Sequence, residues 1–188
     1  MRSILFLPLL VGLSVVSCDA PHRATSSLLL KDVNGSDHAA LDAAGARAVV
    51  VLFLGVECPV SNSYAPEINR ICTAYAPRNV TFYAVYVDSD LSPSDARRRA
   101  NDFGYRFPVL LDPNHVLVRR LGATVTPEAA VVAPDGTLLY RGRIDDQWAA
   151  LGRKRHEVTT HDLRTALDAV LANQPVHNSR TEAVGCKI

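Results

Sequence analysis

The feature that most constrains the fold is an unbroken apolar run at residues 48–54, Ala-Val-Val-Val-Leu-Phe-Leu. A run of strand length that is rich in β-branched residues and lacks polar alternation is typical of a strand covered on both faces. Residues 81–87 form a second such run. Between the two runs, apolar side chains recur at the spacing of one helix face, at Ile68, Ile71, Cys72 and Tyr75. These segments predict a βαβ unit.

Local signals predict the remaining elements. An Asn-Gly turn at residues 34–35 favours a hairpin over residues 28–41, and a Pro-Asp-Gly turn favours another between residues 128–133 and 137–144. Helices are expected from the capping residue Ser92 to Gly104, over about 115–121, and over the amphipathic segment 160–172. The sequence therefore predicts an α/β domain with a central mixed β-sheet flanked by helices and an N-terminal β-hairpin.

The N-terminal segment has the pattern of an export signal. After Arg2, residues 4–16 form an apolar run that is short for a membrane span, which is typical of a signal peptide at residues 1–17. The run ends in Val-Val-Ser-Cys, which resembles a bacterial lipobox and makes Cys18 the lipidation site. The alternative is an ordinary cleavage site near Ser17, with Cys18 an incidental thiol.

The rest of the chain is expected to hold one domain. Residues 18–27 form a short polar segment that suits a tether. Residues 28–173 carry the sequence patterns of the helices and strands and form the domain. Residues 174–188 form a C-terminal tail with little helix or strand signal. The formal net charge of +1 on 188 residues gives no reason to expect a nucleic-acid partner. We expect an exported protein of the bacterial cell envelope, anchored to the membrane through its lipid and facing the periplasm.

Cys58 is the residue whose position indicates chemistry. It stands where the first apolar strand gives way to a helix, in Gly-Val-Glu-Cys-Pro-Val-Ser-Asn. Unpaired N–H groups at the first turn of a helix favour a thiolate, which is the nucleophilic form of cysteine. Pro59 suits the first helical position. The alternative is a small buried apolar residue at a strand end.

With Cys58-Pro59 and four further motifs, the chain resembles the thioredoxin-like superfamily, and within it the peroxiredoxin-like redoxin proteins of the alkyl hydroperoxide reductase and thiol-specific antioxidant type. The motifs are Phe-Pro-Val-Leu-Leu-Asp at 107–112, Leu-Gly-Ala-Thr-Val-Thr-Pro-Glu at 121–128, Asp-Gly at 135–136 with Tyr-Arg-Gly-Arg-Ile-Asp-Asp at 140–146, and the final Gly-Cys-Lys-Ile. The resemblance implies a thioredoxin-like fold. It also implies a cis peptide bond before Pro127, facing the reactive Cys58 and leaving the backbone of Thr126 open to substrate.

Two positions depart from the family pattern. Ser61 stands where thioredoxins have a second cysteine, so a Cys-x-x-Cys disulfide cannot form. Gly55 stands where peroxiredoxins have a threonine that orients the peroxide. An arginine from a neighbouring strand completes the peroxide site in that family; Arg143 is the candidate here, ahead of Arg141. As ordinary strand residues, both arginines would face solvent.

Two other thiols are candidates to resolve an oxidised Cys58. Cys72 follows 14 residues later and, along a continuous helix, would lie about 21 Å away, so we expect it in the core. Cys186 lies in the tail, and a flexible tail is expected to bring its sulfur to Cys58, for a permanent or a catalytic disulfide. The alternative is an incidental terminal thiol.

Together these features predict an exported thiol oxidoreductase. Its Cys58 thiolate would reduce a peroxide or exchange with a partner's disulfide, and an unidentified thiol reductant would restore it. No cofactor and no metal are expected. The alternative is a non-catalytic or copper-carrying module on the same fold. Copper binding is disfavoured because the chain lacks the Cys-x-x-x-Cys motif of copper-delivering relatives. Asn62 stands where that motif has its second cysteine.

Overall fold

The computed structural model describes residues 28–43 and 45–188. The signal peptide expected at residues 1–17, the lipidation site Cys18 and the tether at 18–27 lie outside the described residues. Within the described part of the chain, no helix is long and apolar enough to cross a membrane.

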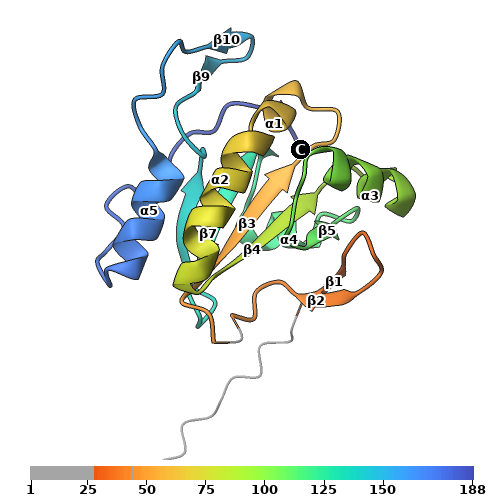
Figure 1. Cartoon of the computed structure of the whole chain (residues 1–188), viewed down its shortest axis with the longest axis horizontal. Coiled ribbons are helices and arrows are strands. Elements are labelled where there is room, and N and C mark those ends of the chain that lie inside the picture. Colours follow the sequence, from red (N-terminus) through yellow and green to blue (C-terminus); the bar gives the residue numbers. More distant parts are fainter. Residues whose placement is uncertain (1–27, 44) are drawn as a thin grey trace, which may run out of the picture.

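A five-stranded mixed sheet forms the centre of the fold (Figure 1). Its strand order is β5-β4-β3-β7-β8. The strands are β3 (Ala48–Leu54), β4 (Val80–Tyr86), β5 (Val109–Leu111), β7 (Glu128–Val132) and β8 (Leu138–Gly142). β3 pairs in parallel with β4 and antiparallel with β7, so the expected βαβ unit and the mixed sheet are confirmed.

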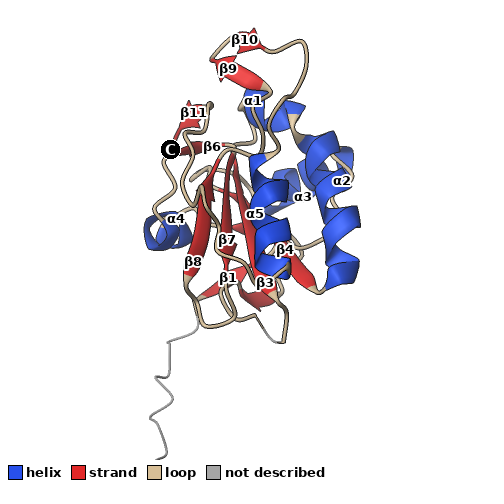
Figure 2. Ribbon diagram, turned by 90° about the vertical axis from the view of Figure 1, so that its left-hand side faces the viewer, coloured by secondary structure: helices blue, strands red, loops and turns tan. Residues whose placement is uncertain are grey.

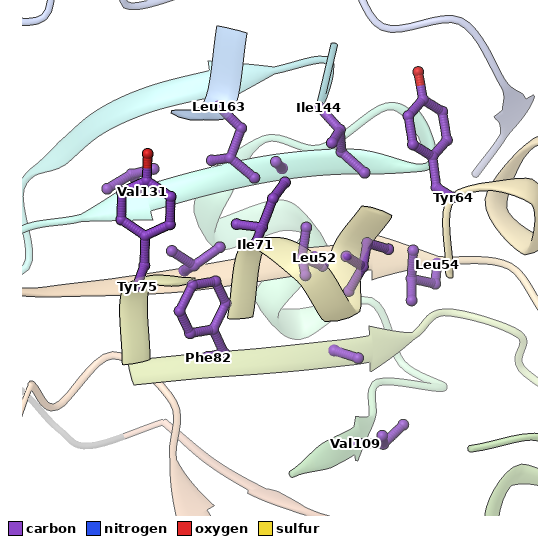
Figure 3. Packing of buried hydrophobic residues seen from close by; sticks show 14 of the residues in the cluster. Leu52, Leu54, Tyr64, Ile71, Tyr75, Phe82, Val109, Val131, Ile144 and Leu163 are labelled. Atoms are coloured by element: carbon purple, nitrogen blue, oxygen red, sulfur yellow. The ribbon is translucent and has the colours of Figure 1, made fainter. Parts of the chain in front are cut away.

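Both faces of β3 are covered, which explains its unbroken apolar sequence. Its even-numbered residues pack against α2 (Ala65–Tyr75), α3 (Pro93–Asp102) and α5 (Asp162–Leu171), whereas its odd-numbered residues pack on the α4 (Val116–Leu121) side. Figure 2 shows α4 on the opposite side of the sheet from the other three helices. Figure 3 shows Leu52 and Leu54 of β3 in the same core cluster as Ile71 of α2.

The helix that follows β3 is broken into two. α1 (Pro59–Ser63) ends at Tyr64, whose N–H donates to the Ser61 carbonyl, and α2 then begins at Ala65. Pro66 lacks the N–H that a continuous helix would need at this point, which accounts for the break. The sequence-based expectation of one continuous helix is therefore wrong, although Cys72 does pack against the core. A short 3-10 turn, η1 (Ala76–Arg78), leads into β4.

The N-terminal hairpin is confirmed, and the structure adds short strands that the sequence did not predict. The hairpin pairs β1 (Leu29–Lys31) with β2 (Asp37–Ala39). The additional strands are β5 in the sheet, β6 (Val125–Thr126), and the hairpin of β9 (Trp148–Ala150) with β10 (Arg153–Lys154).

Residues 174–185 of the C-terminal tail form no helix or named strand, in keeping with their weak sequence signal, but the tail is held in place and the expectation of a flexible tail is wrong. Its last residues form β11 (Cys186–Lys187), which pairs antiparallel with β6, beside it in Figure 2. Farther upstream, Arg180 bridges to Arg141 of β8. Such pairing uses main-chain groups and therefore leaves little trace in side-chain patterns.

Candidate functional site

Cys58 is the N-cap residue of α1, at the carboxyl end of β3, and only 4% of it is exposed. Side chains from neighbouring elements fix the loop before it. Asp88, which follows β4, accepts a hydrogen bond from the Val56 N–H at 3.0 Å, and the Asn62 amide donates to the Val56 carbonyl at 3.0 Å. The thiol is thus held by a loop that is tied both to the sheet and to α1.

The segment of β6 and Pro127 faces the thiol. The Thr126–Pro127 peptide bond is cis, as the resemblance implies. The Cys58 thiol donates a hydrogen bond to the Thr126 carbonyl oxygen at 3.1 Å. The structure therefore brings together Cys58, Thr126 and Pro127, three of the residues selected from the sequence.

Gly55 leaves space that the side chain of Thr126 uses. A Cβ atom at Gly55 would lie 2.8 Å from the Thr126 hydroxyl oxygen and 3.3 Å from the Cys58 Cβ. Both separations are shorter than ordinary van der Waals contacts. The position that lacks the family's threonine thus has a hydroxyl beside it, supplied by Thr126 from another strand.

Cys186 reaches Cys58 through strand pairing. Cys186 is opposite Thr126 and Lys187 is opposite Val125, and the Ile188 N–H donates to the Thr124 carbonyl at 3.1 Å. A side chain on the residue before Cys186 would overlap the Thr126 carbonyl oxygen, so only glycine, Gly185, allows this close approach. The tail is thus an ordered strap that holds the second sulfur beside the first.

A second anchor holds the tail upstream of β11. The Thr181 N–H donates to the Arg141 carbonyl at 3.1 Å, and the Thr181 hydroxyl shares a hydrogen bond of 2.7 Å with the Tyr140 hydroxyl. Any side chain at Gly142 would overlap Thr181. Two attachments, to β8 and to β6, therefore fix the course of the tail.

The two thiols differ in acidity. Burial opposes ionisation of Cys58, but hydrogen bonds from the Cys186 thiol and from Ser61 outweigh it and lower the pKa of Cys58 to about 7. The hydrogen bond to Cys58, together with burial, raises the pKa of Cys186 to about 11. At neutral pH a large share of Cys58 is therefore thiolate, whereas Cys186 keeps its proton.

Alkylation of Cys58 by iodoacetamide is expected to rise with pH to half its maximum at about pH 7, because only the thiolate reacts. Replacing Cys186 with Ala removes a hydrogen-bond donor to the thiolate, so the midpoint should move to higher pH. Mass spectrometry of the modified peptides measures both profiles. A midpoint that is the same in wild type and C186A would contradict this assignment, and Cys72→Ser serves as the control.

The two candidate arginines form ion pairs with carboxylates. The Arg143 guanidinium pairs with Asp162 at 2.8 Å, and the Arg141 guanidinium pairs with Glu128 at 3.0 Å. Both arginines therefore have carboxylate partners, and a role for Arg143 toward peroxide stays a prediction. Glu57, next to the thiol in sequence, points to solvent with 82% of its side chain exposed. Burial raises the pKa of Cys72, in keeping with its place against the core.

Ser61 contributes to the site in a way the sequence analysis did not foresee. In the sequence, Ser61 stands where thioredoxins have a second cysteine, and that resemblance predicts no role of its own for the serine. Its backbone N–H and its hydroxyl both stabilise the Cys58 thiolate. The spacing between Cys58 and Ser61 could have indicated this role. Ser61 is the third residue after the N-cap, and the N–H at that position points toward the N-cap side chain. Since α1 has only five residues, the hydrogen bonds from Cys186 and Ser61, rather than a long helix dipole, account for the lowered pKa of Cys58.

The described residues show no fit to a metal. Among them, no group of three or more histidine, cysteine or acidic side chains is placed to hold an ion. Cys58 and Cys186 are instead free thiols that lie next to the same residue, Thr126. The arrangement suits thiol chemistry between two sulfurs.

Comparison with known proteins gives a family match and several structural matches. The family model named Redoxin matches residues 19–159. An uncharacterized conserved protein from Geobacillus kaustophilus has a TM-score of 0.74 at 28% identity, over 85% of this chain and 86% of its own. A hypothetical protein from Sinorhizobium meliloti 1021 has a TM-score of 0.74 at 25% identity, over 86% and 89% of the two chains.

A more distant structure shows the same fold. It is a secreted Mycobacterium tuberculosis disulfide oxidoreductase homologous to E. coli DsbE, with a TM-score of 0.54 at 17% identity, over 78% of this chain and 96% of its own. No curated protein matches the sequence significantly. The structural matches confirm the thioredoxin-like fold.

Proposed function

Because this chain belongs to the Redoxin family, we propose that it is a thiol oxidoreductase whose Cys58 and Cys186 form one redox couple. The observation that carries the proposal is the pairing of β11 with β6, which sets Cys186 opposite Thr126, the residue whose carbonyl oxygen accepts a hydrogen bond from the Cys58 thiol. The pKa of Cys58 near 7 adds a ready supply of thiolate. The disulfide-oxidoreductase activity named for a structural neighbour agrees with this role.

The proposed reaction is thiol–disulfide exchange with a partner. The Cys58 thiolate attacks one sulfur of a partner disulfide, the S–S bond breaks, and the partner's second sulfur leaves and takes up a proton. The Cys186 thiol then loses its proton and attacks the Cys58 sulfur, and the partner's first sulfur leaves and is protonated. Two electrons and two protons have passed to the partner, and a Cys58–Cys186 disulfide remains. An external dithiol reduces that disulfide.

The hydrogen bond between the two thiols also orders these steps. Cys186 has a raised pKa because it donates to the Cys58 thiolate. Once Cys58 is in a mixed disulfide, its sulfur carries no negative charge, so this cause of the raised pKa of Cys186 is gone. Cys186 therefore gains acidity only after Cys58 has reacted, which is when its attack is needed.

Peroxide is the second candidate substrate, favoured by the Thr126 hydroxyl beside Gly55. Here the Cys58 thiolate would attack one peroxide oxygen, the O–O bond would break, and Cys58 would become a sulfenic acid while alcohol or water leaves. Condensation with the Cys186 thiol would release water and give the same disulfide. The pairing of Arg143 with Asp162 places this reaction second, because the arginine expected at a peroxide site already has a partner.

The test is mass spectrometry of the reduced protein after stoichiometric oxidation. Hydrogen peroxide in the presence of dimedone, and separately a disulfide-bonded peptide, should each be tried. We expect the disulfide peptide to convert the protein to the Cys58–Cys186 disulfide, and Cys58→Ser to abolish this reaction, whereas Cys72→Ser leaves it unchanged. A Cys58 that reacts with neither oxidant would refute the proposal, and faster reaction with peroxide would reverse the order of the two substrates.

We also propose that the protein is exported and anchored through Cys18. The apolar run at residues 4–16 and the Val-Val-Ser-Cys sequence support this location, as does the secreted nature of one structural neighbour. Replacing Cys18 with Ser should release the protein from membranes, and unchanged membrane association would argue against the anchor.

A further inference from the structure

The hairpin of β9 and β10 stands apart from the central sheet. It forms a two-stranded sheet of its own, and Figures 1 and 2 both show it projecting at the end of the molecule where α1 lies. A lone two-stranded hairpin is marginally stable in water, so one that projects in this way indicates a use outside the fold. We propose that this hairpin docks a redox partner whose disulfide is flanked by acidic residues. The inference rests on the proposed function and names the chemistry of the partner.

The hairpin concentrates positive charge on the surface. Every residue from 151 to 157 is exposed, and this run, Leu-Gly-Arg-Lys-Arg-His-Glu, has three basic residues against one acidic residue. Arg155 pairs with Asp146 at 3.5 Å, whereas in the described part of the chain the side chains of Arg153 and Lys154 have no acidic partner. The formal net charge of the whole chain is only +1, so this charge is a local feature. It is available to the carboxylates of another molecule.

The tip of the hairpin adds an apolar contact. Leu151 is 64% exposed, the largest exposed fraction among the large apolar side chains that the structure describes as exposed. It stands two residues before Arg153. An apolar side chain with charged neighbours is the composition of a protein interface, in which apolar contact gives affinity and complementary charge selects the partner.

The base of the hairpin adjoins the thiol site. The Trp148 indole N–H donates to the Ser63 hydroxyl at 3.1 Å, and Ser63 is the last residue of α1, whose N-cap is Cys58. Five helical residues advance about 7.5 Å, so this contact lies close to the thiol. Trp148 also lines a small cavity together with Pro127 and Val184. The hairpin is therefore anchored to the helix that begins at the thiol and next to the cis-proline segment.

The basic side chains lie within reach of a partner bound at Cys58. In the hairpin, Lys154 is opposite Trp148 and Arg153 is opposite Ala150. In an extended partner, acidic residues three to five positions from the reacting cysteine lie about 10–16 Å from it, farther than the length of α1. Such residues can pass α1 and contact the hairpin.

The acidic residue beside the thiol does not oppose this partner. Glu57 is paired with Arg99 at 3.0 Å. A protein also suits the position better than a lipid surface does. A membrane seated on the hairpin would cover the approach to Cys58, which the proposed exchange needs. Charge on the hairpin would instead steer an acidic protein toward the thiol and raise the rate of encounter.

The test measures thiol–disulfide exchange between the reduced full-length protein and three synthetic peptides. Each has a central cysteine activated as the mixed disulfide with thiopyridine, and paired Glu, Gln or Lys residues about four positions away on either side. Release of thiopyridone gives the rate, Cys58→Ser gives the background, and uncharged dipyridyl disulfide is the small-molecule reference. At low salt we expect the Glu peptide to react roughly tenfold faster than the Gln peptide, and the Lys peptide to be the slowest.

Salt should remove most of this difference. Between about 0.01 M and about 1 M ionic strength, the screening length falls from about 30 Å to about 3 Å. The rates with the three peptides should therefore converge, while the rate with dipyridyl disulfide changes little. A preference for the Glu peptide that persists unchanged at high salt would contradict an electrostatic origin.

A charge-reversal variant locates the effect. Arg153→Glu combined with Lys154→Glu should reverse the order of the Glu and Lys peptides and leave the rate with dipyridyl disulfide unchanged. The matched control combines Arg119→Glu with Arg120→Glu, another exposed neighbouring pair, which lies on α4. It has the same net charge as the hairpin variant and should keep the wild-type order of the peptides.

The outcomes separate this inference from the proposed function. Equal rates for the three peptides, or equal effects of the two double variants, with Cys58 still reactive toward dipyridyl disulfide, would overturn the docking hairpin and leave the thiol chemistry intact. A Cys58 that reacts with none of the reagents would overturn both. Equal peptide rates, with Cys18→Ser protein that sediments with phosphatidylglycerol vesicles only when the hairpin charges are intact, would assign the hairpin to a lipid surface instead.

Discussion

Replacing Glu128 with Ala is expected to lower the free energy of unfolding by about 3–5 kcal/mol, because it leaves a buried arginine without its counter-charge. The Glu128 side chain is 5% exposed and that of Arg141 13%, and a carboxylate oxygen lies 3.0 Å from the guanidinium Nε. The same carboxylate accepts the Thr124 N–H at 2.8 Å, and the guanidinium donates to the Leu121 and Gly122 carbonyls. The pair thus ties the end of α4 to β6.

Urea denaturation monitored by circular dichroism measures this effect. The control is Asp37→Ala, which removes an exposed ion pair: the Lys31 side chain is 65% exposed and that of Asp37 56%. This substitution should change the free energy of unfolding by less than about 1 kcal/mol. Because Glu128 holds Thr124, directly before β6, we also expect slower formation of the Cys58–Cys186 disulfide in E128A. Equal stability of the two variants would contradict the assignment of Glu128 and Arg141 as a buried supporting pair.

The sequence predicted the elements whose side chains carry a strong pattern. β3 has an apolar side chain at every position because both of its faces are covered, and α3 begins at the capping residue Ser92, whose hydroxyl accepts the Asp95 N–H at 3.1 Å. The position of Cys58 followed from the same strand-to-helix boundary. In these places local chemistry and tertiary packing require the same residues, so the sequence alone is sufficient to predict the element.

The partners of Cys58 were harder to predict, because they depend on segments that are distant in sequence. Nothing local to Gly185 and Cys186 signals a strand, since β11 pairs with only two residues and uses main-chain groups to do so. The fit of Thr126 against Gly55 likewise joins residues 71 positions apart. The resemblance suggested the identity of the residues, whereas their contacts emerge only when β3, β6 and β11 are placed together.

The substitution Gly55→Thr is expected to impair the site, although it introduces the hydroxyl that peroxiredoxins have at this position. The space for a side chain is already taken, with the Thr126 hydroxyl oxygen 2.8 Å from the new Cβ atom. Overpacking of this kind costs about 1–3 kcal/mol of stability. The rate of disulfide formation should be more sensitive than the stability. If β6 moves away to make room, both the Thr126 carbonyl and Cys186 move away from the Cys58 sulfur. A displacement of about 1 Å is enough to slow disulfide formation roughly 100-fold.

A double-mutant cycle isolates the cause of that loss. Thr126→Ala removes the hydroxyl oxygen and leaves a Cβ atom 3.7 Å from the one that Gly55→Ala adds, which is an ordinary contact. Gly55→Ala should therefore be less harmful in the Thr126→Ala background than in wild type, with a coupling of about 1–2 kcal/mol in unfolding free energy. The rate of Cys58–Cys186 disulfide formation should recover in parallel. Additive effects in the cycle, or a G55T protein that oxidises as fast as wild type, would show that Thr126 does not fill the space beside Gly55 in solution.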